Sequence, residues 1–310
     1  MTEWAVMFPG QGSQSVGMGY ELARHDHLAR LTFEEADDAL GYDLSRLIFK
    51  GPAEKLEDTE VQQPAILVVS VAAWRALKHE QPDFVPALAM GLSLGEYSAY
   101  VAAGAMAFAD AVRLTRIRGR AMQNAVPKGT GGMLAVVGLN AQTVEAICKE
   151  ASHRGHVEPA NFNAPGQIVI SGYVEGLELA ETLIREAGGR AVRLAVSAPF
   201  HSRLLEPAGE AVKRALTEMR LGRAAFPIIA NVDGEPCWEP DDIVPRLVAQ
   251  VSRPVRFETG VRRALADGVT HFLELGPGRS LSSLVKKIDR SVNVAAVQDP
   301  EGLRKALELL

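Results

Sequence analysis

Gly91-Leu92-Ser93-Leu94-Gly95 separates a short apolar run, Ala87-Leu88-Ala89-Met90, from an alanine-rich stretch that begins at Glu96. The apolar run predicts a buried strand, and the alanine-rich stretch predicts a helix that reaches about Ala103. A Gly-x-Ser-x-Gly pentapeptide between them predicts a sharp turn that exposes the serine, because side chains two residues to either side of it would collide. The free amides at the start of the helix would then face any oxyanion that develops beside Ser93.

The pentapeptide alone is a weak pattern that also fits a structural turn, and its context favours a nucleophilic serine, which needs a base. Of the seven histidines, His201 has the best position, since it follows a predicted strand and precedes a helix. Ligands bind at that edge of a parallel sheet. Between Ser93 and His201 we find no convincing Asp or Glu to orient the imidazole. We therefore predict a Ser-His dyad whose histidine is held by a backbone carbonyl.

Outward from this turn, apolar runs alternate with helical patterns along most of the chain. Strands are predicted at 4–8, 227–231, 270–275 and 292–297. Helices are predicted at 62–79, 107–124, 203–219, 241–251, 257–267, 279–289 and 300–309. This alternation predicts an α/β protein with a mainly parallel sheet that is covered on both faces.

The middle of the chain has a different pattern. After the glycine-rich stretch 128–132, the order is strand, helix, two strands, helix and strand, ending at 196. This βαββαβ order predicts a ferredoxin-like subdomain. We therefore expect a discontinuous core formed by residues 1–128 and 197–310, interrupted by an inserted subdomain at 129–196.

Composition excludes several classes of function. The chain has 310 residues and a net charge of −5, which does not fit a nucleic-acid binder. Its two cysteines, Cys148 and Cys237, form no CxxC pair, and this argues against a disulfide scaffold or a structural zinc site. The opening residues show no signal-peptide pattern, and no uncharged apolar run is long enough to cross a membrane. We expect a cytoplasmic protein without a metal.

Arg118 belongs to a cluster of four arginines between Arg113 and Arg120. The simplest interpretation is a solvated helix face. A buried arginine facing the serine would instead hold a carboxylate through two hydrogen bonds. The pattern alone leaves open which arginine that would be. The glycine-rich segments at 10–12 and 276–278 lack the spacing of a dinucleotide or phosphate loop.

Taken together, these motifs resemble the malonyl-CoA:acyl carrier protein transacylase family, the acyltransferases of bacterial fatty-acid synthesis. The resemblance covers essentially the whole chain. It includes the segments 8–14, 63–65, 91–97, 118–119, 122–123, 161–167, 199–202, 231–234, 250–255 and 274–278.

The resemblance implies an α/β-hydrolase-like core with an inserted ferredoxin-like subdomain. It also implies transfer of a malonyl group from malonyl-CoA to the phosphopantetheine thiol of acyl carrier protein, through a malonyl-serine intermediate and without a cofactor. Such a reaction supplies fatty-acid or polyketide chain elongation.

The resemblance further assigns roles to matching positions. Ser93 is the nucleophile, His201 the base and then the acid, and the backbone amides of Gln11 and Leu94 form the oxyanion hole. Arg118 pairs with the malonyl carboxylate, and the main-chain carbonyl of Gln250 orients the histidine. The positions expected to line the pocket are Gln63, Leu92, Phe200 and Asn163.

One departure from the family pattern is Leu92, where the family usually carries histidine. The change leaves the nucleophile, base and arginine in place but removes a hydrogen-bonding group beside the substrate. Phe200 resembles relatives that select malonyl over methylmalonyl groups, because its ring would crowd an α-methyl branch.

Three other functions stay open: a hydrolase, a non-catalytic subunit that docks a carrier protein, and the transacylase subunit of a malonate decarboxylase. A simple esterase has no carboxylate for Arg118 to bind, and intact Ser93 and His201 argue against a docking subunit. We expect acyl carrier protein and malonyl-CoA or CoA as partners, no nucleic acid or membrane, and a monomer. Docking of an acidic carrier would need a local basic patch, with candidates Arg113, Arg116, Arg190, Lys286 and Lys287.

Overall fold

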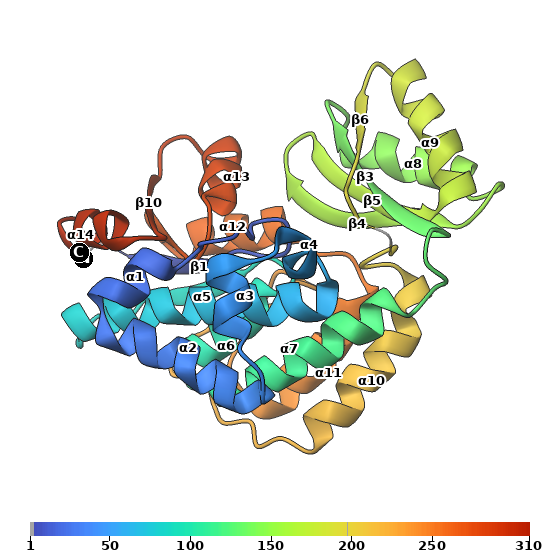
Figure 1. Ribbon diagram of the computed structural model, residues 1–310. Coiled ribbons are helices and arrows are strands. Elements are labelled where there is room, and N and C mark those ends of the chain that lie inside the picture. Colours follow the sequence, from blue (N-terminus) through green and yellow to red (C-terminus); the bar gives the residue numbers. More distant parts are fainter. Residues whose placement is uncertain (1–2, 197) are drawn as a thin grey trace.

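Two sheets organise the molecule (Figure 1). The structure is a computed structural model and describes residues 3–196 and 198–310. Residues 1–2 and 197, which fall at the edges of the two predicted core ranges, lie outside the described residues. A six-stranded sheet and its helices form the larger part of the fold, and a four-stranded sheet with two helices stands apart from it in Figure 1.

The six-stranded sheet is parallel except at one edge. Its strands, in spatial order, are β10 (Asn293–Val297), β9 (His271–Leu275), β1 (Trp4–Phe8), β2 (Leu88–Gly91), β7 (Ile228–Ile229) and β8 (Pro236–Cys237). β1 and β2 are central and fully buried, as a continuous apolar run predicts for a strand with both faces covered. The serine turn follows β2 directly.

Helices cover both faces of this sheet. The side chains of β1 show this, since they alternate between two hydrophobic cores. Trp4, Val6 and Phe8 belong to one core, and Ala5 and Met7 to the other. The first core includes residues of α1 (Tyr20–His25), α2 (His27–Leu40), α3 (Leu44–Lys50), α4 (Ala53–Leu56), α5 (Thr59–Glu80), α6 (Gly95–Ala102), α7 (Phe108–Gln123), α10 (Glu206–Thr217), α11 (Pro240–Ser252) and α14 (Pro300–Leu307). The second includes residues of α12 (Phe257–Ala266) and α13 (Ser280–Ile288).

The four-stranded sheet is antiparallel and comes from one continuous stretch of chain. Its elements are β3 (Gly131–Val137), α8 (Ala141–Ala151), β4 (Val157–Ala164), β5 (Gln167–Tyr173), α9 (Val174–Glu186) and β6 (Arg190–Arg193). The spatial order β4-β5-β3-β6 and a separate hydrophobic core confirm the predicted ferredoxin-like arrangement. The exact division at 128/129 and 196/197 stays a prediction.

β4 also attaches this sheet to the larger part of the fold, through the segment between α11 and α12. Phe162 N donates to Val255 O and Val255 N donates to Ala160 O, both at 2.8 Å. The register of β4 against β5 shifts on either side of this attachment, between Pro159 and Asn161 and again between Phe162 and Ala164. Such irregularities bend a strand and redirect its side chains, and here they lie where β4 meets the core.

Several predicted boundaries differ from the structure. Helix α5 begins at Thr59 instead of Gln62, so Pro64 lies in the second turn of the helix. The helix is also buried on nearly all sides. β6 ends at Arg193, and a short 3-10 helix, η1 (Arg203–Leu205), precedes α10. The short elements α3, α4 and β8 carry no sequence pattern strong enough to predict them.

The carboxyl ends of β1 and β2 are adjacent, since Phe8 pairs with Gly91 in the parallel register. The loop after β1 carries Gln11, and the turn after β2 carries Ser93. The fold therefore brings the two glycine-rich segments of the amino-terminal half together. Within the described chain, no helix is long and apolar enough to span a membrane.

Candidate active site

The turn at Ser93 is strained and enclosed by backbone. Ser93 has φ of 54°, a left-handed conformation that is uncommon outside glycine. A Cβ on Gly91 would lie 2.0 Å from the carbonyl carbon of Gly95, and one on Gly95 would lie 1.9 Å from Phe8 O. Both glycines are therefore required by close backbone approach, which is the collision that the pentapeptide predicts.

Side chains from distant elements hold this turn on both sides. Asn231 accepts from Ser93 N at 2.6 Å through Oδ1 and donates to Gly91 O at 2.7 Å through Nδ2. Gln250 Nε2 donates to Ser93 O at 2.8 Å. The peptide groups before and after the serine are thus both satisfied by buried amides, and these bonds offset the cost of the strained conformation.

His201 faces the serine, as predicted. Its Nε2 lies 2.7 Å from Ser93 Oγ, and its Nδ1 lies 2.8 Å from Gln250 O. A carbonyl oxygen only accepts, so Nδ1 carries the hydrogen and neutral Nε2 presents a lone pair to the hydroxyl. Among residues 3–196 and 198–310, Ser93 and His201 (φ 57°) are the only non-glycine residues with positive φ.

The environment keeps this imidazole neutral. His201 is buried, and burial is the main reason why its pKa is lowered to about 3. The charge of Arg118 acts in the same direction, while hydrogen bonds to the backbone of Gln250 and Arg253 oppose it. At neutral pH His201 is therefore unprotonated, which is the state that a general base requires.

Arg118 is the arginine of its cluster that lies against the serine. It is fully buried, its Nη2 donates to Ser93 Oγ at 3.0 Å and to Gln250 Oε1 at 2.8 Å, and its Nη1 donates to Gln63 Oε1 at 2.8 Å. Its Nε has no hydrogen-bond partner in the described chain. The guanidinium also lies over the ring of Tyr97, 5.2 Å from its centroid. The solvated-face interpretation is therefore wrong for Arg118.

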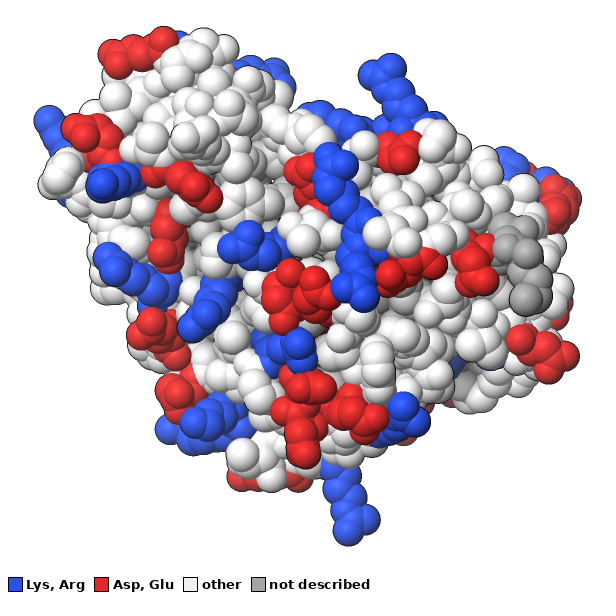
Figure 2. All heavy atoms as spheres, turned by 180° about the vertical axis from the view of Figure 1, so that it is seen from behind, with Lys and Arg blue, Asp and Glu red and all other residues white. Residues whose placement is uncertain are grey.

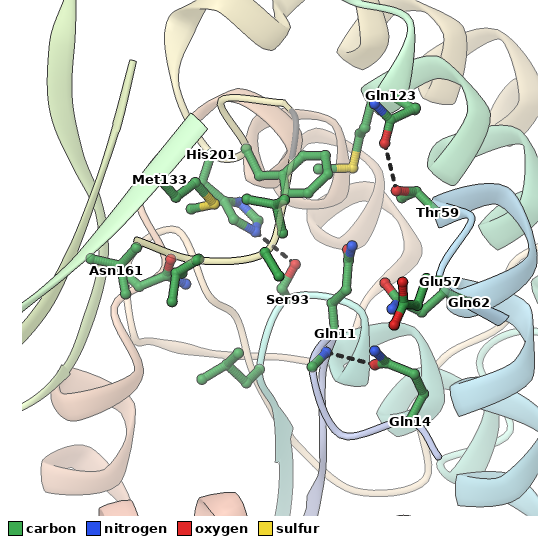
Figure 3. A pocket seen from close by; sticks show the side chains of 18 of the residues that line it. Gln11, Gln14, Glu57, Thr59, Gln62, Ser93, Gln123, Met133, Asn161 and His201 are labelled. Carbon is green, nitrogen blue, oxygen red and sulfur yellow. Dashed lines mark hydrogen bonds between the residues drawn. The ribbon is translucent and has the colours of Figure 1, made fainter. Parts of the chain in front are cut away.

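A cavity of about 470 Å³ opens above the serine. Figure 3 shows Ser93 and His201 facing each other, with Met133 and Asn161 on one side of them and Gln62 and Thr59 on the other. The predicted pocket residues Leu92, Phe200 and Asn163 also line it, as does Gln11. The cavity thus lies between the core and the inserted sheet, with wall residues from both.

One pocket assignment does not match the structure. Gln63 is fully buried behind this wall and bonds to Arg118 and, through Nε2, to Met122 Sδ at 3.6 Å. Its neighbour Gln62 lines the cavity instead, with a buried Oε1 that has no partner in the described chain. Consecutive residues on a helix point about 100° apart, so Gln63 faces the arginine while Gln62 faces the cavity. Arg118 itself is likewise absent from the cavity wall.

The predicted oxyanion groups occupy suitable places. Leu94 follows the nucleophile and immediately precedes α6, where helix amides are free and the dipole favours negative charge. Gln11 lies in the adjacent loop after β1 and lines the cavity. Within the described residues, neither backbone N–H donates to an acceptor of the chain. Both amides are thus available to an oxygen bound beside Ser93.

Three residues that the sequence did not assign also contribute to the site: Asn231, Gln62 and the fully buried Glu96. Glu96 accepts from Gln250 Nε2 at 2.8 Å and from Asn231 N at 3.0 Å. A charged residue directly after the pentapeptide, in an otherwise uncharged helix, is the signal that could have indicated it. Asn231 and Gln62 show no comparable signal.

The chain is similar to known acyltransferases in sequence and in fold. A family model described as the acyl transferase domain matches residues 6–300. The malonyl CoA-acyl carrier protein transacylase of Bacillus subtilis (strain 168) is 45% identical over 100% of the chain and 98% of its own length. The enzyme of the same name from Escherichia coli (strain K12) is 43% identical over the full length of both chains. A malonyl-transacylase solved in complex with a type II PKS acyl-carrier protein superposes with a TM-score of 0.97, at 43% identity and with both chains fully covered.

Proposed function

The chain belongs to the acyl transferase family, and on that premise we propose that it moves a malonyl group from malonyl-CoA to the pantetheine thiol of an acyl carrier protein through Ser93. The observation that carries the proposal is the convergence on Ser93 Oγ of a neutral imidazole at 2.7 Å and a buried guanidinium at 3.0 Å. A base and a carboxylate-binding cation at one nucleophile fit an acidic acyl group. The names of the relatives support the same reaction.

In the first step His201 Nε2 takes the proton of Ser93 as the hydroxyl oxygen attacks the thioester carbonyl. The amides of Gln11 and Leu94 bind the oxyanion, each contributing about 3–4 kcal/mol in comparable sites. Collapse of the tetrahedral intermediate breaks the bond between carbon and sulfur, and the imidazolium returns the proton to the departing CoA thiolate. The products of this step are CoA and malonyl-Ser93.

In the second step the carrier's pantetheine thiol gives its proton to His201 and attacks the serine ester. The same amides bind the new oxyanion, and the proton passes to Ser93 Oγ as the ester breaks. Because the two half-reactions are near mirror images, one base serves both. The exchange uses only the chain's own residues and its two substrates, so we propose that no cofactor takes part.

Arg118 is assigned to the malonyl carboxylate. Malonyl carries this group one methylene beyond the acyl carbonyl, so an ester on Oγ places it near the guanidinium that already contacts Oγ. The guanidinium is fully buried, and a charge pair formed there is little screened by water. Contact with the carboxylate requires Arg118 to exchange its present bond to Ser93 Oγ for one to the substrate.

The proposal includes the carrier as a macromolecular partner, supported by the carrier complex of the similar malonyl-transacylase. Figure 2 shows lysine and arginine side chains interspersed with aspartate and glutamate over the face opposite Figure 1. Among the candidate cations, Arg113 pairs with Asp110 at 3.1 Å and Lys287 donates to Gln167 Oε1 at 3.3 Å. We further propose that the protein is a monomer and that it is cytoplasmic; the two free, buried cysteines support the second point.

The experiment that tests this function is intact-mass measurement after incubation with malonyl-CoA, followed by addition of carrier protein bearing its pantetheine arm. The proposal predicts a stable malonyl adduct with malonyl-CoA alone, and its quantitative transfer to the carrier thiol. Rapid loss of the adduct to free malonate before the carrier is added would identify a hydrolase instead.

A further inference from the structure

Glu96 is a buried carboxylate that takes no part in the two reaction steps proposed above. It lies three residues after the nucleophile, in the first turn of α6, and is fully buried. Its Oε2 accepts from Gln250 Nε2 at 2.8 Å and from Asn231 N at 3.0 Å, and its Oε1 accepts from Tyr100 OH at 3.3 Å. A buried carboxylate is costly unless it is well bonded, so its position needs a reason.

The first consequence concerns the side chain of Gln250. An amide can present either its oxygen or its nitrogen to a neighbour, and a carboxylate oxygen accepts only. Glu96 Oε2 and Ser93 O both accept from Gln250 Nε2, which turns Gln250 Oε1 toward Arg118 Nη2 at 2.8 Å. Glu96 therefore fixes the orientation of the amide that receives the arginine.

The second consequence concerns the serine turn. Asn231 holds Ser93 N and Gly91 O through its side chain, while its own backbone N–H is bound by Glu96. The same carboxylate oxygen thus holds both residues that clamp the strained peptide groups around the nucleophile. Loss of that oxygen would leave two buried N–H groups unsatisfied beside the reacting atoms.

The charge of Glu96 does not by itself explain its hydrogen bonds to Gln250 and Asn231. Burial raises the pKa of Glu96 to about 7, opposed by hydrogen bonds from Gln250, Asn231 and Tyr100 and by the charge of Arg118. Oε2 already accepts two N–H groups, so a proton taken up by Glu96 belongs on Oε1. Oε1 faces Tyr100 OH, which can then donate to Cys237 Sγ, 3.1 Å away, and accept the proton of Oε1. The bonds to Gln250 and Asn231 are compatible with either protonation state.

We propose that Glu96 is a positioning residue, whose Oε2 holds Gln250 and Asn231 in place and through them aligns Arg118 and the backbone of Ser93 for attack. This inference rests on the proposed function for its substrate, but not for its central claim about the reactivity of Ser93. Glu96 acts through other residues and touches no reacting atom.

Two substitutions of Glu96 distinguish the position of its carboxylate from its charge. Glu96→Gln keeps an oxygen at the position of Oε2 and removes the charge, whereas Glu96→Asp keeps the charge and withdraws the carboxylate by one methylene. Glu274 offers a matched control, since it is equally buried but holds Leu281 N, Ser282 N and Ser282 Oγ at the start of α13. The same two changes are made there.

The readout is the rate constant for covalent modification of Ser93, measured by intact mass with malonyl-CoA and separately with an arylsulfonyl fluoride. Thermal unfolding is followed in parallel. The sulfonyl fluoride reports on the nucleophile whatever the natural substrate is. If the wild-type protein reacts with it but not with malonyl-CoA, the proposed function fails while the role of Glu96 is still decided by the sulfonyl fluoride rates.

We expect Glu96→Asp to slow both reactions about 100-fold, the scale of a small misplacement of reacting groups, and Glu96→Gln to stay within about tenfold of wild type. Both Glu274 substitutions should lower the unfolding temperature without changing the rate at which Ser93 of the folded protein is modified. Unchanged Ser93 reactivity in Glu96→Asp would show a merely structural carboxylate. A larger loss in Glu96→Gln than in Glu96→Asp would show that charge, and not the hydrogen bonds, matters. Either result overturns the proposal.

Discussion

The two walls of the catalytic cavity differ in how firmly their residues are held. On the core side, Ser93 and His201 both have positive φ, and each is held by buried hydrogen bonds to Gln250. On the side of the inserted sheet, Met133, Asn161, Asn163 and Val169 line the cavity from strands without positive-φ residues other than glycine. The Oδ1 of Asn163 is buried and has no partner in the described chain.

This difference indicates a division of work. The core wall carries the reacting atoms, and the hydrogen bonds that hold Ser93 and His201 are already made before substrate arrives, which is the condition for electrostatic preorganisation. The inserted wall offers surface and an unused acceptor, which suits contact with the non-reacting part of a substrate. Changes to the core wall should therefore lower the rate of chemistry, and changes to the inserted wall should mainly weaken binding.

Replacement of the nucleophile should give the largest effect on the core side. Ser93→Ala removes the attacking oxygen while leaving the glycines and amides of the turn, so malonyl transfer should fall by at least about 10⁴-fold with the fold intact. Intact mass after exposure to malonyl-CoA checks this. A malonylated Ser93→Ala protein would show that another residue is the nucleophile.

Loss of the guanidinium should change selectivity. Arg118→Ala should weaken malonyl transfer by about 2–4 kcal/mol through lost charge pairing, and improve acetyl transfer relative to malonyl. The measurement is kcat/KM for malonyl-CoA and acetyl-CoA. Arg116→Ala is the matched control on the same helix, because Arg116 stacks on Tyr42 away from Ser93 and should leave selectivity unchanged. Equal selectivity in all three proteins would remove Arg118 from substrate recognition.

The serine turn should not tolerate even one added methyl group. Gly95→Ala places a Cβ against Phe8 O, and the resulting overpacking should lower the free energy of unfolding by about 1–3 kcal/mol or more, with a matching loss of Ser93 reactivity. Gly222→Ala is the control, since its nearest neighbour would be 3.7 Å away and its φ is not positive. Thermal unfolding compares the stability of the two variants, and intact mass after reaction with malonyl-CoA compares the reactivity of Ser93. A stable, fully active Gly95→Ala protein would contradict the described turn.

The pH dependence of Ser93 acylation should report the environment that keeps His201 neutral. His201 has a pKa of about 3 in the folded chain, so acylation at saturating substrate should not decline near pH 6.5, where an ordinary histidine titrates. Since the unfolded chain binds this proton more readily, the free energy of unfolding should fall as the pH drops from about 6.5 toward 3.

Arg118→Ala removes a cause of the lowered pKa, so the acidic limb of the rate profile should move to higher pH. Arg116→Ala should leave the limb in place. If the limb of the wild-type protein already lies near pH 6.5, His201 is not held neutral in the way described.

The smallest effect is expected on the inserted wall. Asn163→Ala removes the unpartnered acceptor and should raise KM by a few-fold, about 0.5–1.5 kcal/mol for one hydrogen bond, with the rate of Ser93 acylation at saturation unchanged. Steady-state and single-turnover kinetics separate the two quantities. A lower acylation rate would place part of the chemistry on this wall.

The sequence predicts the fold and the reacting pair for physical reasons. Apolar runs and helical patterns give the strands and helices in order, and the pentapeptide gives the turn, because only glycine fits beside Phe8 and Glu96. His201 is predicted because few residue types can act as a base at neutral pH, and its position after a strand directs it to the sheet edge.

What the sequence does not predict depends on tertiary contacts. The two consecutive glutamines of α5 illustrate this, since a helix buried on nearly all sides has no apolar stripe from which to read which side faces the cavity. Gln63 is therefore assigned to the wrong side in place of Gln62. Asn231 comes from a loop far along the chain, and its clamp on Ser93 exists only once β7 pairs with β2.

The most direct test of this division is the single-turnover rate of malonyl-Ser93 formation at saturating malonyl-CoA, with the adduct located by digestion and mass spectrometry. It is measured in the wild-type protein, Arg118→Ala and Asn163→Ala. The account predicts that the adduct is on Ser93 in all three, and that its rate falls only in Arg118→Ala. An adduct on another residue, or an equal loss of rate in both variants, would contradict it.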